Sequence, residues 1–196
     1  MQIGAQFFTL RDFCKDLDGF SESLKKVADI GYKTVQISGT CPFEAEWLKA
    51  ELSKNGLKCV LTHTPADSLV KETEKVISDH NIFDSDYIGL GYYEMASNPA
   101  EKVEKFIATY KEVARKISDG GKYFMYHHHD HELIKLDGKT LLERMAEEIP
   151  AEHMGITLDT YWVQMGGGNP CDWLEKFSNR VPCIHLKDLM YGQKMA

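Results

Sequence analysis

The sequence has no long apolar run, no signal-peptide pattern in its first residues and no paired cysteine motif. None of its apolar stretches approaches the ~20 residues that span a bilayer. The first residues lack the basic region and apolar core of a signal peptide. The five cysteines are odd in number, widely spaced and never arranged as CxxC, which favours a reducing compartment over a disulfide framework. We therefore expect a soluble, cytoplasmic protein.

The balance of charge and composition excludes further classes of protein. A formal net charge of -7 would repel the phosphates of a nucleic acid and gives no reason to expect membrane binding. With 43% hydrophobic and 27% charged residues and no low-complexity tract, the chain is typical of a folded globular protein. Its 196 residues can bury a substantial core, and we expect a single domain over residues 1–196.

Short apolar runs alternate with amphipathic segments along the whole chain. Several runs are almost continuously apolar, which is typical of parallel strands that are covered on both faces. The predicted strands are residues 2–8, 34–38, 58–63, 87–92, 123–128, 155–159 and 183–186. Apolar residues at helical spacing predict helices around residues 20–28, 47–52, 103–117, 141–145 and 173–177. Gly31 and Gly56 are expected to end the first two helices.

The spacing of the predicted strands favours a (β/α)8 barrel. The strands recur about every 30 residues, as in a TIM barrel of ~250 residues. An open doubly wound sheet alternates in the same way, but its glycine-rich turn after the first strand is replaced here by Thr9, Leu10, Arg11 and Asp12. Seven strands fall within the chain, so we expect a barrel truncated after the seventh strand. Its exposed apolar edges would pair with another chain, as in a homo-oligomer, or belong to a longer protein.

A histidine-rich segment follows the fifth predicted strand, at the end where TIM barrels build their active sites. Residues 126–132 read YHHHDHE and continue an apolar strand directly, which disfavours an engineered tag. Alternation at the strand end would aim His127 and His129 to one side and His128 to the other. A solvated loop and a segment in which at least one histidine binds a metal ion or substrate both fit this pattern.

Two further strand ends carry side chains of the kind that bind metals. Asp159 ends an apolar run, where an aspartate is ordinarily a helix N-cap or a turn residue. Trp162 follows closely and would suit the apolar wall of a sugar site. His185 lies within an apolar strand, where a lone histidine is usually a hydrogen-bonded core residue. Taken with Glu132 at a neighbouring strand end, these residues favour a site for Mn²⁺, Mg²⁺, Co²⁺ or Zn²⁺.

These segments resemble the sugar phosphate isomerase/epimerase family, the xylose isomerase-like TIM barrels that also include endonuclease IV. Residues 4–12 (GAQFFTLRD) resemble the opening GxQLYTxRD, and residues 31–36 (GYKTVQ) resemble GYxxVE with Gln36 in place of glutamate. Residues 126–133 resemble the segment YHNHDxEF, with His128 in place of asparagine. Residues 159–162 (DTYW) and 185–188 (HLKD) resemble the elements D-x-x-W and HLKD.

The resemblance implies a divalent metal ion held by Glu, Asp, His and Glu at strand ends. Asp159 and His185 match the second and third positions. Glu132 is our choice for the first position, with His127 and His129 as competitors, and the last glutamate would lie on an eighth strand. Glu132 and His129 are the expected catalytic residues. The residues expected to contact the substrate are His63, Trp162, Lys187 and Arg11, although a salt bridge with Asp12 or another loop acid would explain Arg11 equally well.

The leading hypothesis is isomerisation or epimerisation of a sugar or sugar phosphate. The metal ion would hold adjacent sugar oxygens and stabilise an enediolate, while a neighbouring carboxylate or histidine removes the proton next to the carbonyl. A keto-sugar or keto-glycoside hydratase or lyase is a close alternative. An endonuclease IV-like phosphodiesterase is disfavoured by the acidic charge, and a degenerate sugar-binding barrel is the non-enzymatic alternative.

Overall fold

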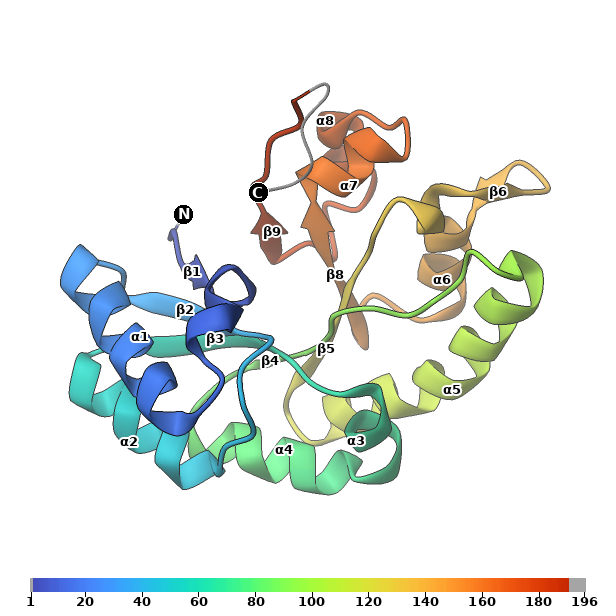
Figure 1. The fold of residues 1–196 in the computed structure, drawn as a ribbon. Helices are drawn as coiled ribbons and strands as arrows, with labels where there is room; N and C mark the ends of the chain where they lie inside the picture. Colours follow the sequence, from blue (N-terminus) through green and yellow to red (C-terminus); the bar gives the residue numbers. More distant parts are fainter. Residues whose placement is uncertain (1, 191–196) are drawn as a thin grey trace. The chain divides into compact units, whose positions relative to one another are not determined.

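The computed structural model describes residues 2–190, which form two compact units. Unit 1 extends to Leu90 and adds Asp119–Lys122, and unit 2 contains Gly91–Ser118 and the described residues from Tyr123 onward. Each unit contains a parallel β-sheet with helices packed against it (Figure 1). That residues 1–196 form a single domain stays a prediction.

Unit 1 contains four parallel strands in the order β1-β2-β3-β4. The strands are β1 (Ala5–Gln6), β2 (Thr34–Ile37), β3 (Lys58–His63) and β4 (Tyr87–Leu90). The helices between them are α1 (Leu17–Ile30), α2 (Ala45–Asn55), α3 (Ala66–Lys71) and α4 (Thr73–Ile82). All four strands lie within predicted strands, and α1 and α2 are the helices that the apolar spacing predicts. Helices α3 and α4 were not predicted.

The first strand is shorter than the sequence predicts. β1 covers only two residues, and Phe7–Phe13 forms the 3-10 helix η1. The side-chain oxygen of Gln6 accepts a hydrogen bond from the backbone N–H of Phe8, and Thr9 Oγ1 donates to the carbonyl oxygen of Gln6. Because these local bonds satisfy the backbone outside a sheet, they turn the chain away from the strand. The prediction of a strand through Phe8 was therefore wrong.

Helix α1 packs through its predicted apolar stripe. Phe20, Leu24 and Val27 are buried, and the ring of Phe20 contacts that of Phe7 at 5.6 Å. The helix ends at Gly31, whose φ of 116° lies in the left-handed region that favours glycine. Both the stripe and the position of the helix end are as predicted.

Unit 2 contains three parallel strands in the order β5-β8-β9. They are β5 (Tyr123–His127), β8 (Met154–Asp159) and β9 (Cys183–His185). All six residues of β8 are buried, as expected for a strand covered on both faces. The helices are α5 (Pro99–Asp119), α6 (Leu141–Glu148), α7 (Thr160–Met165) and α8 (Pro170–Lys176). The 3-10 helix η2 (His131–Leu133) and the hairpin of β6 (Lys135–Leu136) and β7 (Lys139–Thr140) follow β5.

The two units together supply seven strands of the βα type, and a complete TIM barrel has eight. Because the strands of unit 2 are parallel, their carboxyl ends share one edge of the sheet. His127, Asp159 and His185 are the last residues of β5, β8 and β9. No helix between residues 2 and 190 is long and apolar enough to cross a membrane. All five cysteines are free thiols.

Candidate metal centre

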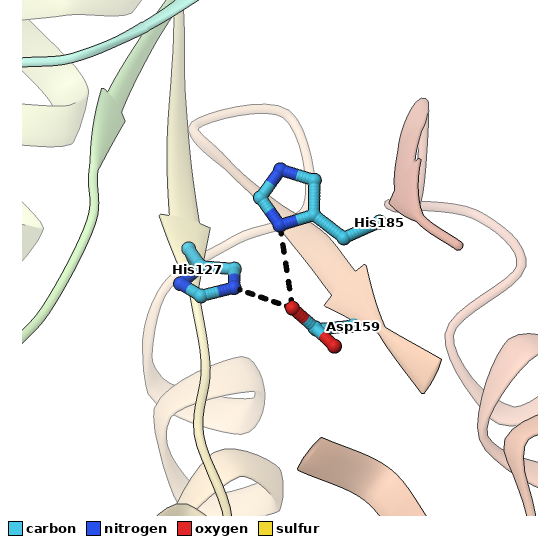
Figure 2. A group of neighbouring side chains, drawn as sticks. All are labelled: His127, Asp159 and His185. Carbon is cyan, nitrogen blue, oxygen red and sulfur yellow. Dashed lines mark hydrogen bonds and ion pairs between the residues drawn. The ribbon is translucent and has the colours of Figure 1, made fainter. Parts of the chain in front are cut away.

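Three buried side chains converge at the strand ends of unit 2 (Figure 2). Asp159 Oδ2 lies 3.0 Å from His127 Nε2 and 3.4 Å from His185 Nδ1. One ligand atom of each residue lies within 4.8 Å of the other two. The exposed fractions are 5% for His127, 0% for Asp159 and 8% for His185. The three side chains therefore form a compact donor set that is largely shielded from solvent.

The hydrogen bonds of His127 fit a metal ligand. Its Nδ1 lies 3.0 Å from the carbonyl oxygen of Gly91, and its Nε2 lies 3.0 Å from Asp159 Oδ2. Both partners only accept hydrogen bonds, whereas a neutral imidazole has a single N–H to donate. A second proton on His127 or a cation bound by Nε2 and the carboxylate would satisfy both contacts. A metal-bound histidine usually donates its other ring N–H to a backbone carbonyl or a carboxylate, as the contact of Nδ1 with Gly91 would allow here.

Asp159 serves both as a strand-end carboxylate and as the N-cap of α7. Its Oδ1 accepts hydrogen bonds from the backbone N–H groups of Tyr161 at 3.1 Å and Trp162 at 3.4 Å. Its Oδ2 faces the two imidazoles and lies 2.7 Å from Lys187 Nζ. Burial favours the neutral acid, but the bonds from the imidazoles and Lys187 outweigh burial and hold the pKa of Asp159 well below its usual range. The carboxylate is therefore ionised at neutral pH.

His185 supplies a neutral imidazole to the same cluster. Burial lowers its pKa to about 4, although the hydrogen bond to Asp159 raises it in part. The ring therefore carries no charge at neutral pH. The segment that follows His185 is tied to the start of α7 by Thr160. The hydroxyl of Thr160 accepts a hydrogen bond from the backbone N–H of Lys187 at 2.9 Å, and its own donor contacts the carbonyl oxygen of Lys187 at 2.5 Å. These two hydrogen bonds tie the backbone just after His185 to the residue that follows Asp159.

The consecutive histidines after β5 have different surroundings. The rings of His127 and His129 contact each other edge-on at 4.7 Å, in line with the alternation expected at the strand end. His128 is fully buried, and its Nε2 accepts a hydrogen bond from the backbone N–H of Asp159 at 3.1 Å. Its Nδ1 donates to the carbonyl oxygen of His129 at 3.0 Å. Burial lowers the pKa of His128 to about 4, so this histidine is a neutral structural residue outside the donor set.

An aromatic group lies beside the three converging residues. The ring of His129 lies 4.9 Å from Trp162, 5.1 Å from Tyr92 and 5.7 Å from His131, measured between centroids. His129 Nδ1 is buried and has no hydrogen-bond partner among the described residues. Burial and the neighbouring imidazoles lower the pKa of His129 to about 2, so the ring is uncharged. His129 thus offers one ring nitrogen without a partner among the described residues, in the midst of aromatic rings.

Glu132, the predicted first ligand, is not one of the three residues that converge. Its fully buried carboxylate accepts hydrogen bonds from the hydroxyl of Tyr126 and, at 2.9 Å, from the backbone N–H of His129. His131 Nε2 lies 3.3 Å away. Burial raises the pKa of Glu132 above its usual range. The donor set in the structure thus has two imidazoles and one carboxylate, instead of the carboxylate-rich set that was expected, and a ligand role for Glu132 stays a prediction.

His63, a predicted substrate contact, ends β3 in unit 1. Its Nε2 lies 2.8 Å from the side-chain nitrogen of Gln36, and its Nδ1 lies 2.9 Å from Ser38 Oγ. Gln36 is the residue that replaces the glutamate of the family pattern, and here it holds the ring of His63. The contact of His63 with a substrate stays a prediction.

Arg11, also in unit 1, is held by the turn in which it lies. Its Nη1 donates to the carbonyl oxygen of Phe8 at 2.7 Å, and its guanidinium lies 4.5 Å from the centroid of the Phe8 ring. Asp12 pairs with Lys15 at 3.1 Å, and Arg11 forms no salt bridge with Asp12 or another acid among residues 2–190. Its contact with a substrate stays a prediction.

Comparisons with known proteins find matches by structure but none by sequence. No protein-family model matches the chain, and no curated protein sequence matches it. Among solved structures, a sugar phosphate isomerase/epimerase from Parabacteroides distasonis matches all of this chain and 78% of its own, with a TM-score of 0.81 and 19% identity. A xylose isomerase domain protein from Planctomyces limnophilus matches 84% of this chain and 68% of its own, with a TM-score of 0.67 and 18% identity.

The chain has the fold of the xylose isomerase-like TIM barrels. A probable 3-DHS dehydratase from Bacillus anthracis matches 96% of this chain and 73% of its own, with a TM-score of 0.72 and 13% identity. Proteins described by different reactions thus share the xylose isomerase-like fold. The fold by itself does not select the reaction, which has to be argued from the site.

Sequence reasoning missed two aromatic residues near the cluster. Tyr126 was quoted only as the first letter of the histidine-rich segment, yet its hydroxyl holds the buried Glu132. Tyr92 was assigned only to the end of a predicted strand, and it lies against the ring of His129. The position of Tyr92 at a strand end, where these barrels gather polar side chains, was the signal that could have found it.

Proposed function

We propose that this chain is a divalent-metal-dependent isomerase or epimerase that acts on a sugar or sugar phosphate by removing a proton next to a carbonyl. The observation that carries the proposal is the buried cluster of His127, Asp159 and His185 at the strand ends of unit 2. Barrels of this fold place their chemistry at that end of the strands.

His127, Asp159 and His185 would hold the metal ion. Among Mn²⁺, Mg²⁺, Co²⁺ and Zn²⁺, two imidazole nitrogens favour the transition metals over Mg²⁺, which prefers oxygen ligands. Bound there, the ion would polarise a substrate carbonyl and stabilise the negative charge that develops when the neighbouring carbon loses its proton. The ionised carboxylate and the neutral His185 are already in the protonation states that ligands need.

Glu132 and His129 are the residues proposed to handle the substrate proton. Burial raises the pKa of Glu132, which brings this carboxylate closer to neutral pH, where a general base is most effective. His129 is a weak base because its pKa is lowered, so its unused Nδ1 is assigned to hydrogen bonding with a substrate hydroxyl. Trp162 would stack on the sugar ring, and Lys187 would bind a substrate oxygen.

A keto-sugar hydratase or lyase is the second candidate. These reactions also begin with removal of a proton beside a metal-held carbonyl, so the same cluster would serve them. The fold shared with a probable 3-DHS dehydratase, at a TM-score of 0.72, supports retaining this candidate.

Turnover in heavy water separates the two candidates. The protein loaded with Mn²⁺ would be incubated with aldoses, ketoses, their phosphates and keto-glycosides, and the products followed by NMR and mass spectrometry. An isomerase or epimerase incorporates solvent deuterium into a product that keeps the substrate's composition, whereas a hydratase or lyase adds or removes a molecule. Asp159→Asn, which keeps an oxygen to cap α7, is the matched inactive control. A metal-loaded protein that binds sugars without exchanging any proton would contradict both candidates.

A further inference from the structure

The ammonium group of Lys187 lies at the oxygen that a metal ion would need. Lys187 Nζ is 2.7 Å from Asp159 Oδ2, the same oxygen that faces His127 and His185. The other carboxylate oxygen caps α7, so it remains engaged. One buried carboxylate oxygen is therefore shared by two imidazoles and an ammonium.

The side chain of Lys187 can move while its backbone stays in place. Thr160 binds both the N–H and the carbonyl oxygen of Lys187, which fixes the main chain beside α7. The side chain is 31% exposed, in contrast to the fully buried Asp159. Among residues 2–190, Asp159 is its only ion-pair partner. The four-carbon stem of a lysine lets the ammonium swing toward solvent without any change in the backbone.

We propose that Lys187 is the resident cation of the metal-free site and that it competes with the metal ion for Asp159 Oδ2. An ionised carboxylate that is fully buried without a counter-charge is strongly destabilising, so the metal-free protein needs a cation at this position. A divalent ion and an ammonium at one oxygen repel each other, and this repulsion is strong in a buried environment. The inference rests on the metal site of the proposed function.

Two roles of Lys187 follow from this competition. In the metal-free protein, the lysine neutralises Asp159 and keeps the strand ends together. When a metal ion binds, the ammonium is released toward the exposed side of the site, where it is free to bind a substrate oxygen. Lys187 therefore lowers metal affinity, and metal binding prepares Lys187 for the substrate.

Calorimetric titration with Mn²⁺ tests the competition directly. In Lys187→Met, which keeps the apolar stem without the charge, we expect the Kd for Mn²⁺ to fall about tenfold, or ~1.4 kcal/mol. Lys176→Met is the matched control, because Lys176 forms an ion pair in the same unit with Glu143 at 2.6 Å and belongs to α8. Its Mn²⁺ affinity should equal that of the wild type. An unchanged or weaker Mn²⁺ affinity in Lys187→Met would overturn the inference.

A second variant and the melting temperatures show whether a change in Mn²⁺ affinity is caused by misfolding. Lys187→Gln keeps a polar group near Asp159, and we expect it also to bind Mn²⁺ more tightly than the wild type. The melting temperature of each variant should be lower than wild type without Mn²⁺ and should recover when Mn²⁺ is added. If the wild type binds Mn²⁺ and neither variant binds it more tightly, only the role of Lys187 fails. If the wild type binds no Mn²⁺, the proposed metal site fails with it.

Discussion

His128 Nε2 accepts a hydrogen bond from the backbone N–H of Asp159 at 3.1 Å, which joins the ends of β5 and β8 beyond their ladder. The last paired residues of these two strands are His127 and Thr157, so Asp159 extends past the ladder. Beyond the ladder, the neutral imidazole of His128 accepts the hydrogen bond in place of a backbone carbonyl oxygen. His128, which lies outside the cluster of three side chains, thus positions the backbone of Asp159, the proposed metal ligand.

Replacing His128 should therefore weaken the strand ends. In His128→Ala, the backbone N–H of Asp159 loses its partner in a buried environment, and we expect the free energy of unfolding to fall by about 1–3 kcal/mol. Urea unfolding followed by circular dichroism measures this change. His129→Ala is the comparison, because Nδ1 of that ring has no partner among the described residues. A His128→Ala variant as stable as the wild type would show that this bond does not matter.

Replacing Glu132 should distinguish a base from a metal ligand. In Glu132→Gln, we expect Mn²⁺ binding to remain and turnover to fall by roughly 10²–10⁴-fold, the usual contribution of a general base. Metal content and kcat are measured on the same sample. Tyr126→Phe keeps the ring but removes the hydroxyl that binds Glu132, and it shows how much of the effect comes from losing this hydrogen bond alone. If Glu132→Gln loses the metal ion, the ligand role implied by the family resemblance is right and the base role is wrong.

The stability of unit 1 should depend on pH through His80. This buried histidine donates from Nδ1 to the carbonyl oxygen of Val76 and accepts from Thr62 at Nε2, so it is held neutral. Burial lowers its pKa from 6.5 to about 4. The unfolded chain therefore binds more protons between these pH values, and stability is lost as the pH falls from about 6.5 to 4. The full loss is about 3 kcal/mol.

The His80 contribution is isolated by comparison with a variant. His80→Gln can still bond to Thr62 but does not titrate, so its free energy of unfolding should fall less between pH 7 and pH 4. Other buried histidines, such as His128 and His185, contribute the same sign in both proteins and cancel in the difference. Parallel pH profiles for the two proteins would contradict this assignment.

Replacing Trp162 should weaken substrate binding more than it affects the metal site. The ring of Trp162 lies 4.9 Å from that of His129, measured between centroids, and supplies an apolar face. Its backbone N–H donates a hydrogen bond to Asp159 Oδ1. In Trp162→Ala, we expect KM for the sugar to rise about tenfold with Mn²⁺ binding unchanged, because a stacking contact is lost. Trp162→Phe should recover most of the affinity. Equal KM values in the wild type and Trp162→Ala would remove Trp162 from the substrate site.

The sequence predicted strands and long helices well because their patterns are local. β8 is apolar throughout and is buried throughout, and the stripe of α1 ends at a glycine that adopts positive φ. Helices α3 and α4 were not predicted because each buries a single apolar residue, Leu69 in α3 and Val76 in α4. β1 was overextended because the side chain of Gln6 ends the strand, and periodicity does not report such a bond.

The metal centre could be predicted only in part. Asp159 and His185 each end an apolar strand, so spacing alone placed them at the correct edge of the sheet. The choice between Glu132 and His127 depended on which side chain faces Asp159, and six polar residues (127–132) follow one another at that strand end. The pairing of His127 with Thr157 and the turn into η2 bring His127, and not Glu132, to Asp159, and sequence spacing does not contain these features. A ligand role for Glu132 stays a prediction.

Metal content tests most directly whether His127, Asp159 and His185 hold an ion. Wild-type protein and Asp159→Asn would be loaded with Mn²⁺ or Zn²⁺, desalted and subjected to elemental analysis, with circular dichroism to confirm that both are folded. We expect about one ion per chain in the wild type and almost none in Asp159→Asn, because the ionised carboxylate would supply the negative charge that a divalent ion needs. A wild type that retains no metal, or a folded Asp159→Asn that retains as much as the wild type, would contradict the metal centre proposed for this chain.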